Sequence, residues 1–112
     1  MQELFERVAA AAGIDLETAE KSIGLILGFL KKEAPEAEMG QLFAAMPGAA
    51  EAAVPSQGNG VMGLAGALTA AGLGMGEMQA VGKELFAYSR EKAGEDAVGA
   101  IAGAVPGLSQ FT

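Results

Sequence analysis

A set of glycine, proline and apolar positions recurs in this sequence after 59 residues. Ala11-Ala12-Gly13-Ile14 returns as Ala70-Ala71-Gly72-Leu73, and Ala45-Met46-Pro47-Gly48 returns as Ala104-Val105-Pro106-Gly107. Nine of the 38 residue pairs between positions 11 and 48 and their counterparts are identical, where roughly one in ten is expected by chance. Because the matches fall at residues that end helices and at apolar positions, we expect two copies of one helical unit.

The first copy has the pattern of three helices. Apolar residues recur at helical spacing over residues 2–12, and Gly13 followed by Ile14 is typical of a left-handed C-cap. Asp15 is a suitable N-cap for a helix over residues 16–33, which Pro35 separates from a short third helix. That helix ends at Pro47. It places four apolar residues on one face, namely Met39, Leu42, Phe43 and Met46.

The second copy repeats this order, with Gly72 and Gly74 at the cap positions and a long helix from residue 75 to about residue 92. No segment alternates like a β-strand. We therefore predict an all-α single domain, a bundle of six main helices in two pseudo-repeated three-helix units, residues 1–49 and 61–110, joined by a linker over residues 50–60. Each unit is too small to bury its own apolar faces, so the two should share one core.

Composition excludes several classes of chemistry. The 112 residues include no cysteine and no histidine, which removes thiolate chemistry together with the commonest metal ligand and general base. The net charge of −7 repels phosphate backbones, so nucleic acid is not an expected partner. We expect no enzymatic activity, no cofactor and no metal site. The N-terminus has acids where a signal peptide has basic residues, which favours a cytoplasmic protein unless a leader has been removed.

The second half carries a family resemblance. Residues 60–68 read Gly-Val-Met-Gly-Leu-Ala-Gly-Ala-Leu, followed by Gly72-Leu73-Gly74-Met75 and Glu95-Asp96-Ala97-Val98-Gly99. With the Gln41-Leu42-Phe43-Ala44-Ala45-Met46-Pro47-Gly48 segment, these resemble the VcgC/VcgE family of small bacterial proteins of unknown function, over residues 11 to about 105. The resemblance implies no catalytic residue and no ligand. It implies an export leader in many members, in conflict with the cytoplasmic prediction.

Three short motifs suggest chemistry but have simpler interpretations. Residues 58–63 spell G-x-G-x-x-G, without the strand and the acid that a dinucleotide site needs, so we interpret them as linker. Ser89 and Lys92 have S-x-x-K spacing without the partner motifs of acyl-transfer enzymes. Two acidic clusters lie at helix starts, where the helix dipole favours them: Glu33, Glu36 and Glu38, and Glu91, Glu95 and Asp96.

Two uncharged stretches raise the question of a membrane. Gly24 and Gly28 form a G-x-x-x-G motif, and residues 61–76 contain no charge. Both stretches are shorter than the ~20 residues that span a bilayer. We interpret them as sites of close helix crossing in a soluble core, with reversible interfacial binding as the alternative, and expect no stable membrane insertion.

Methionines at helix positions that we predict to face inward are the remaining candidate site. Being flexible and polarizable, they could adapt to an apolar ligand or a partner helix, although core filling is the simpler role. The candidate contacts are Met39, Phe43, Met46, Met62, Met75 and Met78. The leading hypothesis is a non-enzymatic helical scaffold or protein-interaction module that self-associates, as a homodimer for example. The alternative is a carrier that holds an apolar small molecule or lipid in a Met-lined gap between the units.

Overall fold

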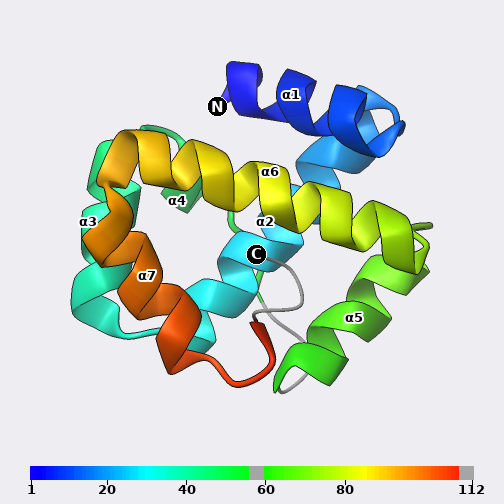
Figure 1. Ribbon diagram of the computed structural model, residues 1–112. Coiled ribbons are helices and arrows are strands. Elements are labelled where there is room, and N and C mark those ends of the chain that lie inside the picture. The colour runs from blue at the N-terminus through cyan, green and yellow to red at the C-terminus, as the bar shows by residue number, and fades with distance from the viewer. Residues whose placement is uncertain (56–59, 109–112) are drawn as a thin grey trace.

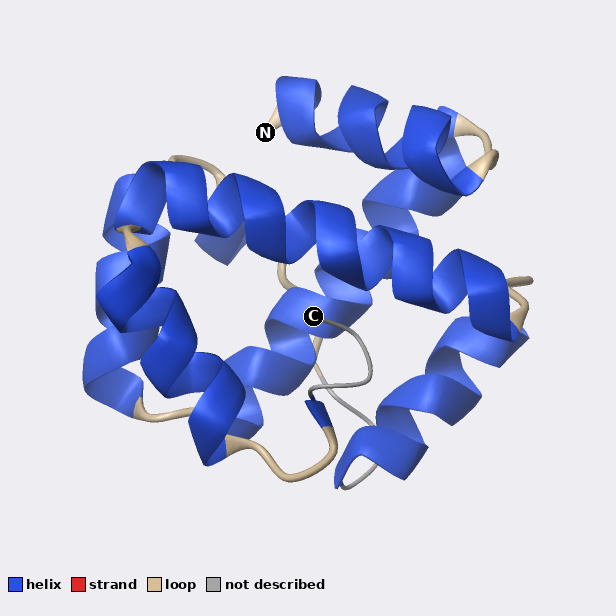
Figure 2. Cartoon of the chain, viewed as in Figure 1, coloured by secondary structure: helices blue, strands red, loops and turns tan. Residues whose placement is uncertain are grey.

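The computed structural model describes residues 1–55 and 60–108, and within these ranges all regular secondary structure is helical (Figures 1 and 2). The first three helices are α1 (Gln2–Ala12), α2 (Leu16–Glu33) and α3 (Glu36–Ala45). A single turn, α4 (Ala49–Ala52), follows. The second half contains α5 (Gly60–Ala70), α6 (Met75–Ala93) and α7 (Glu95–Ala104). The protein is an all-α helical bundle, as predicted, with α4 as an addition to the six expected helices.

The helix bounds recur with the same spacing as the sequence. Adding 59 to the bounds of α3 gives 95–104, which are the bounds of α7. Adding 59 to the bounds of α2 gives 75–92, which ends one residue before the end of α6. Adding 59 to the bounds of α1 gives 61–71, and both of these bounds lie one residue after those of α5. The punctuation residues therefore set the helix ends in both halves.

The predicted caps explain how these ends form. Gly13 and Gly72 have φ angles of 68° and 100°, the left-handed region that glycine adopts without steric cost. The next residue in each case, Ile14 or Leu73, donates its backbone N–H to a carbonyl of the preceding helix at 3.1 Å, as in a Schellman cap. At the following helix, the Asp15 carboxylate accepts the Thr18 N–H at 2.8 Å.

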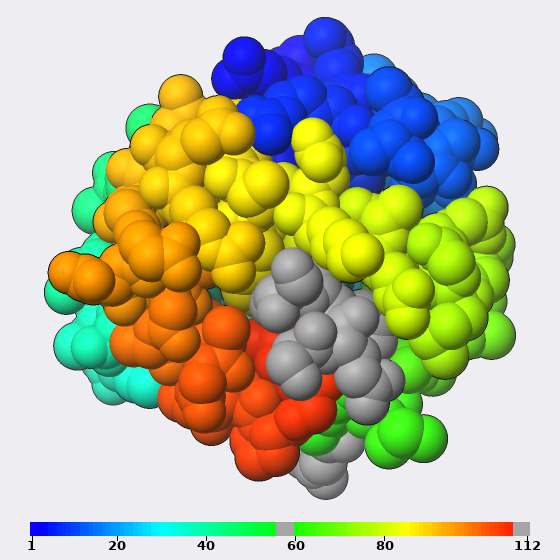
Figure 3. Space-filling view, in the orientation of Figure 1, coloured from blue at the N-terminus to red at the C-terminus, as the bar shows by residue number. Residues whose placement is uncertain are grey.

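The two halves exchange their first helices. Helix α1 packs most extensively on α6, the long helix of the second half, and Figure 3 shows the two side by side. Helix α5 in turn packs on α2, the long helix of the first half. The short helices α3 and α7 pack on each other (Figure 1). Neither half is therefore a separate bundle.

One core results from this exchange. Its largest fully buried side chains come from both halves and include Leu4, Ile23, Phe29, Phe86 and Ile101. The large apolar residues that recur at helical spacing in α6 are all buried, namely Met78, Val81, Leu85, Phe86 and Tyr88. Helical periodicity therefore identified the buried face of this helix correctly.

The G-x-x-x-G motif of α2 has a different role from the predicted helix crossing. The segment that covers it is the end of α4 and the extended residues that follow, and the Val54 N–H donates to the Gly24 carbonyl at 2.9 Å. A Cβ at Gly24 would lie 2.6 Å from the Ala52 carbonyl oxygen, and a Cβ at Gly28 would overlap the Val54 carbonyl. We call residues 52–55 the strap. The backbone of the strap approaches α2 closely because both glycines lack a side chain, and the linker here is a packed element.

Substituting Gly28 tests this close approach. Gly28→Ala should lower the free energy of unfolding by about 1–3 kcal/mol, because the new methyl group displaces Val54 from α2. Gly40→Ala is the matched control, because Gly40 lies within α3 and a Cβ there meets no atom within 4 Å. It should stabilise the protein by about 0.5–1 kcal/mol through helix propensity. Urea denaturation of both variants measures the difference, and equal effects would contradict the packing role of Gly28.

The exchange of first helices predicts that half of the chain cannot fold. A fragment of residues 1–60 lacks α6, so α1 loses the helix on which it packs most extensively. We expect weak helical circular dichroism and no cooperative thermal transition. A sharp melting transition of this fragment would show that the first half has its own core.

Candidate functional site

The six residues proposed from the sequence do not form one site. Met39, Met46 and Met78 are buried in the core, each no more than 3% exposed. Phe43 is partly buried against the same core. These four side chains are thus packing residues.

Met62 and Met75 lie on the surface, 83% and 59% exposed, so their predicted inward orientation is wrong. Helix α5 turns Leu64 and Leu68 toward the core, and Met62 precedes Leu64 by two residues, about 200° around the helix. Met75 is the first residue of α6, and the first buried residue of that helix is Met78. Alternation of small and apolar residues in this stretch left the buried face ambiguous in the sequence.

Helix α5 carries an uncharged outer stripe. Its exposed residues are Met62, Gly66, Thr69 and Ala70. Successive members are four, three and one positions apart in the sequence, which places them on one face of the helix. The stripe lies opposite Leu64 and Leu68, and α5 lies at the edge of the molecule (Figure 1). The corresponding helix of the first half, α1, exposes Glu3 and Glu6 instead. The two related helices therefore present different surfaces to the solvent.

A pocket lies between α2 and the strap. Its volume is about 360 Å³, and its described lining residues are Gly28, Lys31, Lys32, Ala53, Val54 and Pro55. None of the candidate methionines contributes to this lining. The sequence offered no signal for the pocket, because it depends on how the strap crosses α2.

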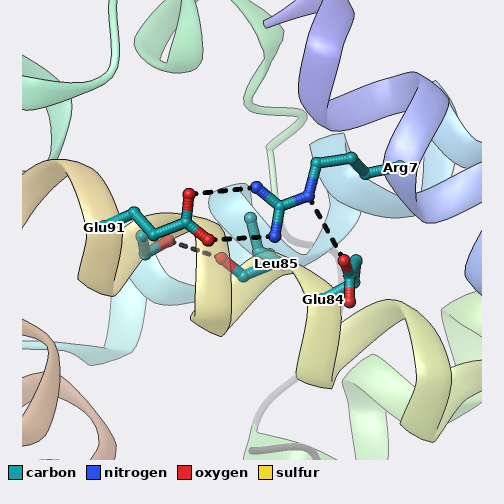
Figure 4. Close-up of polar contacts among 5 residues, drawn as sticks. Arg7, Glu84, Leu85 and Glu91 are labelled. Atoms are coloured by element: carbon teal, nitrogen blue, oxygen red, sulfur yellow. Dashed lines mark hydrogen bonds and ion pairs between the residues drawn. The ribbon is translucent and has the colours of Figure 1, made fainter.

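A polar cluster joins α1 to α6 (Figure 4). The Arg7 guanidinium donates to the Glu84 carboxylate at 3.2 Å and to both carboxylate oxygens of Glu91 at 3.2 and 3.1 Å. Its centre lies 5.4 Å from the centroid of the Tyr88 ring, and the Lys92 ammonium lies at the same distance from that centroid. The carboxylate partners of Arg7 lie 77 and 84 residues further along the chain, so sequence spacing could not reveal them. The cluster ties the exchanged helix to its partner.

The cluster shifts the pKa of an acid. The hydrogen bond from Arg7 lowers the pKa of the Glu91 carboxyl below its ordinary value of 4.5. The pKa of the Asp15 carboxyl is lowered from 3.8 chiefly by its hydrogen bonds with Thr18, as expected of an N-cap. Both acids are exposed and ionised at neutral pH, which suits structural roles.

The other short motifs have local structural roles where the structure describes them. The Ser89 hydroxyl is buried, donates to the Leu85 carbonyl at 2.8 Å and contacts the Met46 sulfur at 3.5 Å, whereas Lys92 lies over Tyr88. Residues 1–55 and 60–108 contain no group of three acids placed to hold a metal ion, and this includes both acidic clusters. The start of the G-x-G-x-x-G motif, Gly58 and Asn59, lies outside the described residues.

Comparison with known proteins identified no match among protein-family models, curated proteins or solved structures. By length and hydropathy, no single helix within the described ranges qualifies as a membrane span, although α5 and α6 together pass as a pair bent by 111°. Assignment of a function therefore depends on the surfaces described above.

Removing Arg7 should destabilise the protein in a pH-dependent way. Because the pKa of Glu91 is lower in the folded state, its interaction stabilises the fold above pH ~4.5 and is lost as the pH falls through the folded pKa. Arg7→Gln should lower the melting temperature at pH 7, and its difference from the wild type should shrink toward pH ~3. Lys21→Gln removes the same charge from an exposed site on α2 and should show no such pH dependence. A pH-independent deficit for Arg7→Gln would indicate lost packing on Tyr88.

Proposed function

We propose that this protein is a non-enzymatic helical interaction module that associates with a second copy of itself through the outer stripe of α5. The observation that supports this proposal is the exposure of Met62, 83%, on a helix face with no charged residue. Isolated apolar residues on a surface are common, whereas an apolar face without charged neighbours is typical of interaction sites.

Electrostatics favour this face over the others for contact between copies. Two copies with a charge of −7 each repel one another, and the repulsion is smallest where charged side chains are most distant. Residues 52–76 contain no Asp, Glu, Lys or Arg. The outer stripe is therefore the surface of α5 where two copies approach with little desolvation of charge.

The shape of the stripe suits a helix pair. Gly66 and Ala70 have minimal side chains, which lets a second helix come close, and Met62 provides an adaptable contact at the end of the stripe. A two-fold arrangement would place α5 against α5 of the other copy. One eleven-residue helix buries less than a stable interface requires, so we expect a weak, reversible dimer.

The remaining sequence interpretations agree with a binding role. A chain without histidine or cysteine lacks the commonest general base and the thiolate nucleophile. We also propose membership of the VcgC/VcgE family and a cytoplasmic location. A carrier of apolar molecules in a Met-lined gap is the weaker candidate, because Met39, Met46 and Met78 are packed in the core.

Placing a charge on the stripe tests the proposal. Met62→Glu should weaken dimerisation at least tenfold, because the contact between copies would desolvate the carboxylate. Sedimentation velocity over a concentration series measures the monomer–dimer equilibrium. For the wild type, raising NaCl from about 20 mM to about 300 mM should strengthen association, since salt screens the repulsion between like-charged copies.

The control adds the same charge elsewhere. Gln41→Glu places a carboxylate on the exposed face of α3 and should leave the dimer unchanged. A wild type that remains monomeric at every concentration, or equal weakening by both substitutions, would contradict self-association through α5.

A further inference from the structure

We infer that the pocket between α2 and the strap binds a small amphipathic anion, a carboxylate with an unbranched alkyl chain. The pocket has an apolar wall and a cationic rim in one partly open surface hollow of about 360 Å³. This inference goes beyond the proposed self-association, because none of the described residues that line the pocket belongs to α5.

The apolar part of the pocket is built by the strap. Ala53, Val54 and Pro55 line it together with Gly28 of α2, on which the backbone of the strap lies directly. The hydrogen bond from the Val54 N–H to the Gly24 carbonyl holds the strap in place at 2.9 Å. Val54 is 40% exposed, and covering it with an alkyl chain would remove that apolar surface from water.

The charged part of the pocket selects the head group. Lys31 and Lys32 are the charged residues among the described lining, and both are exposed at the last turn of α2. Within residues 1–55 and 60–108, Lys31 takes part in no ion pair. The neighbouring acid, Glu33, accepts a hydrogen bond from the Gly60 N–H at 3.4 Å. An anionic head group beside Lys31 would therefore gain a cationic partner in an otherwise acidic protein.

A structural role for the lysines explains only part of this arrangement. Cations in the last turn of a helix complement the negative end of its dipole, which accounts for two lysines at this position. It does not account for the apolar hollow that adjoins them. A volume of about 360 Å³ lies within the range of small-molecule sites, roughly 300–1,000 Å³, and suits a single alkyl chain.

Titration with chemically matched probes tests the inference. Decanoate, decanol and decyltrimethylammonium share a chain and differ in the charge of the head group, and each is used below its micelle-forming concentration. Isothermal calorimetry should show decanoate binding at least fivefold more tightly than decanol, with no measurable binding of the cation. Among shorter carboxylates, each added CH₂ should tighten binding by about fourfold until the pocket is filled. Amide chemical shifts should change at Gly28 and Ala53.

Substitution of the rim separates specific binding from general adsorption. Lys31→Gln should weaken decanoate binding at least fivefold and leave decanol binding unchanged, since it removes only the charge. Lys21→Gln changes an exposed lysine on the same helix outside the pocket and should leave both unchanged. Met62→Glu should also leave both unchanged, which keeps this result independent of the α5 contact. Equal binding of all three probes, or shift changes confined to α5, would overturn the inference.

Discussion

The packing of α1 on α6 is the contact on which the rest of this structure depends. Through this contact the first helix of the first half packs on the long helix of the second half, and α5 makes the reciprocal contact with α2. Two sets of three helices thereby enclose one core, although each set alone has too little apolar surface to do so. The Arg7 cluster lies along this contact and reinforces it with charge-assisted hydrogen bonds, but burial of Leu4 and Val8 supplies its apolar part.

The two copies differ most where the candidate binding surfaces lie. Helix α1 exposes acids, whereas α5 exposes a stripe without charge. Helix α2 has Gly24 and Gly28, which receive the strap, whereas the corresponding positions of α6 are Lys83 and Ala87. The halves share the cap glycines Gly13 and Gly72, and buried positions of their short helices stay apolar without being identical, as in Met39 and Val98 or Leu42 and Ile101. The surfaces for which we propose binding therefore lie where the sequences of the two halves differ.

Local chemistry made the helices predictable. The ends of α2 follow from Asp15 and Pro35, and the turn after α1 follows from the freedom of Gly13 to adopt a positive φ angle. The buried face of α6 follows from helical periodicity, because large apolar residues there recur among charged ones. In α5 the same method was wrong about Met62, because alanine and glycine on every face leave no contrast between the buried and exposed sides.

Local sequence patterns specified an all-α chain, the positions of the six main helices and most of the core, because caps, breakers and periodicity act within a few residues. The partners of each helix, the strap on the G-x-x-x-G motif and the pocket with a cationic rim beside it became visible in the folded structure alone. These features depend on contacts between residues as far apart as Arg7 and Glu91 or Gly24 and Val54. Such contacts arise from packing of whole surfaces, which leaves no local pattern in the chain.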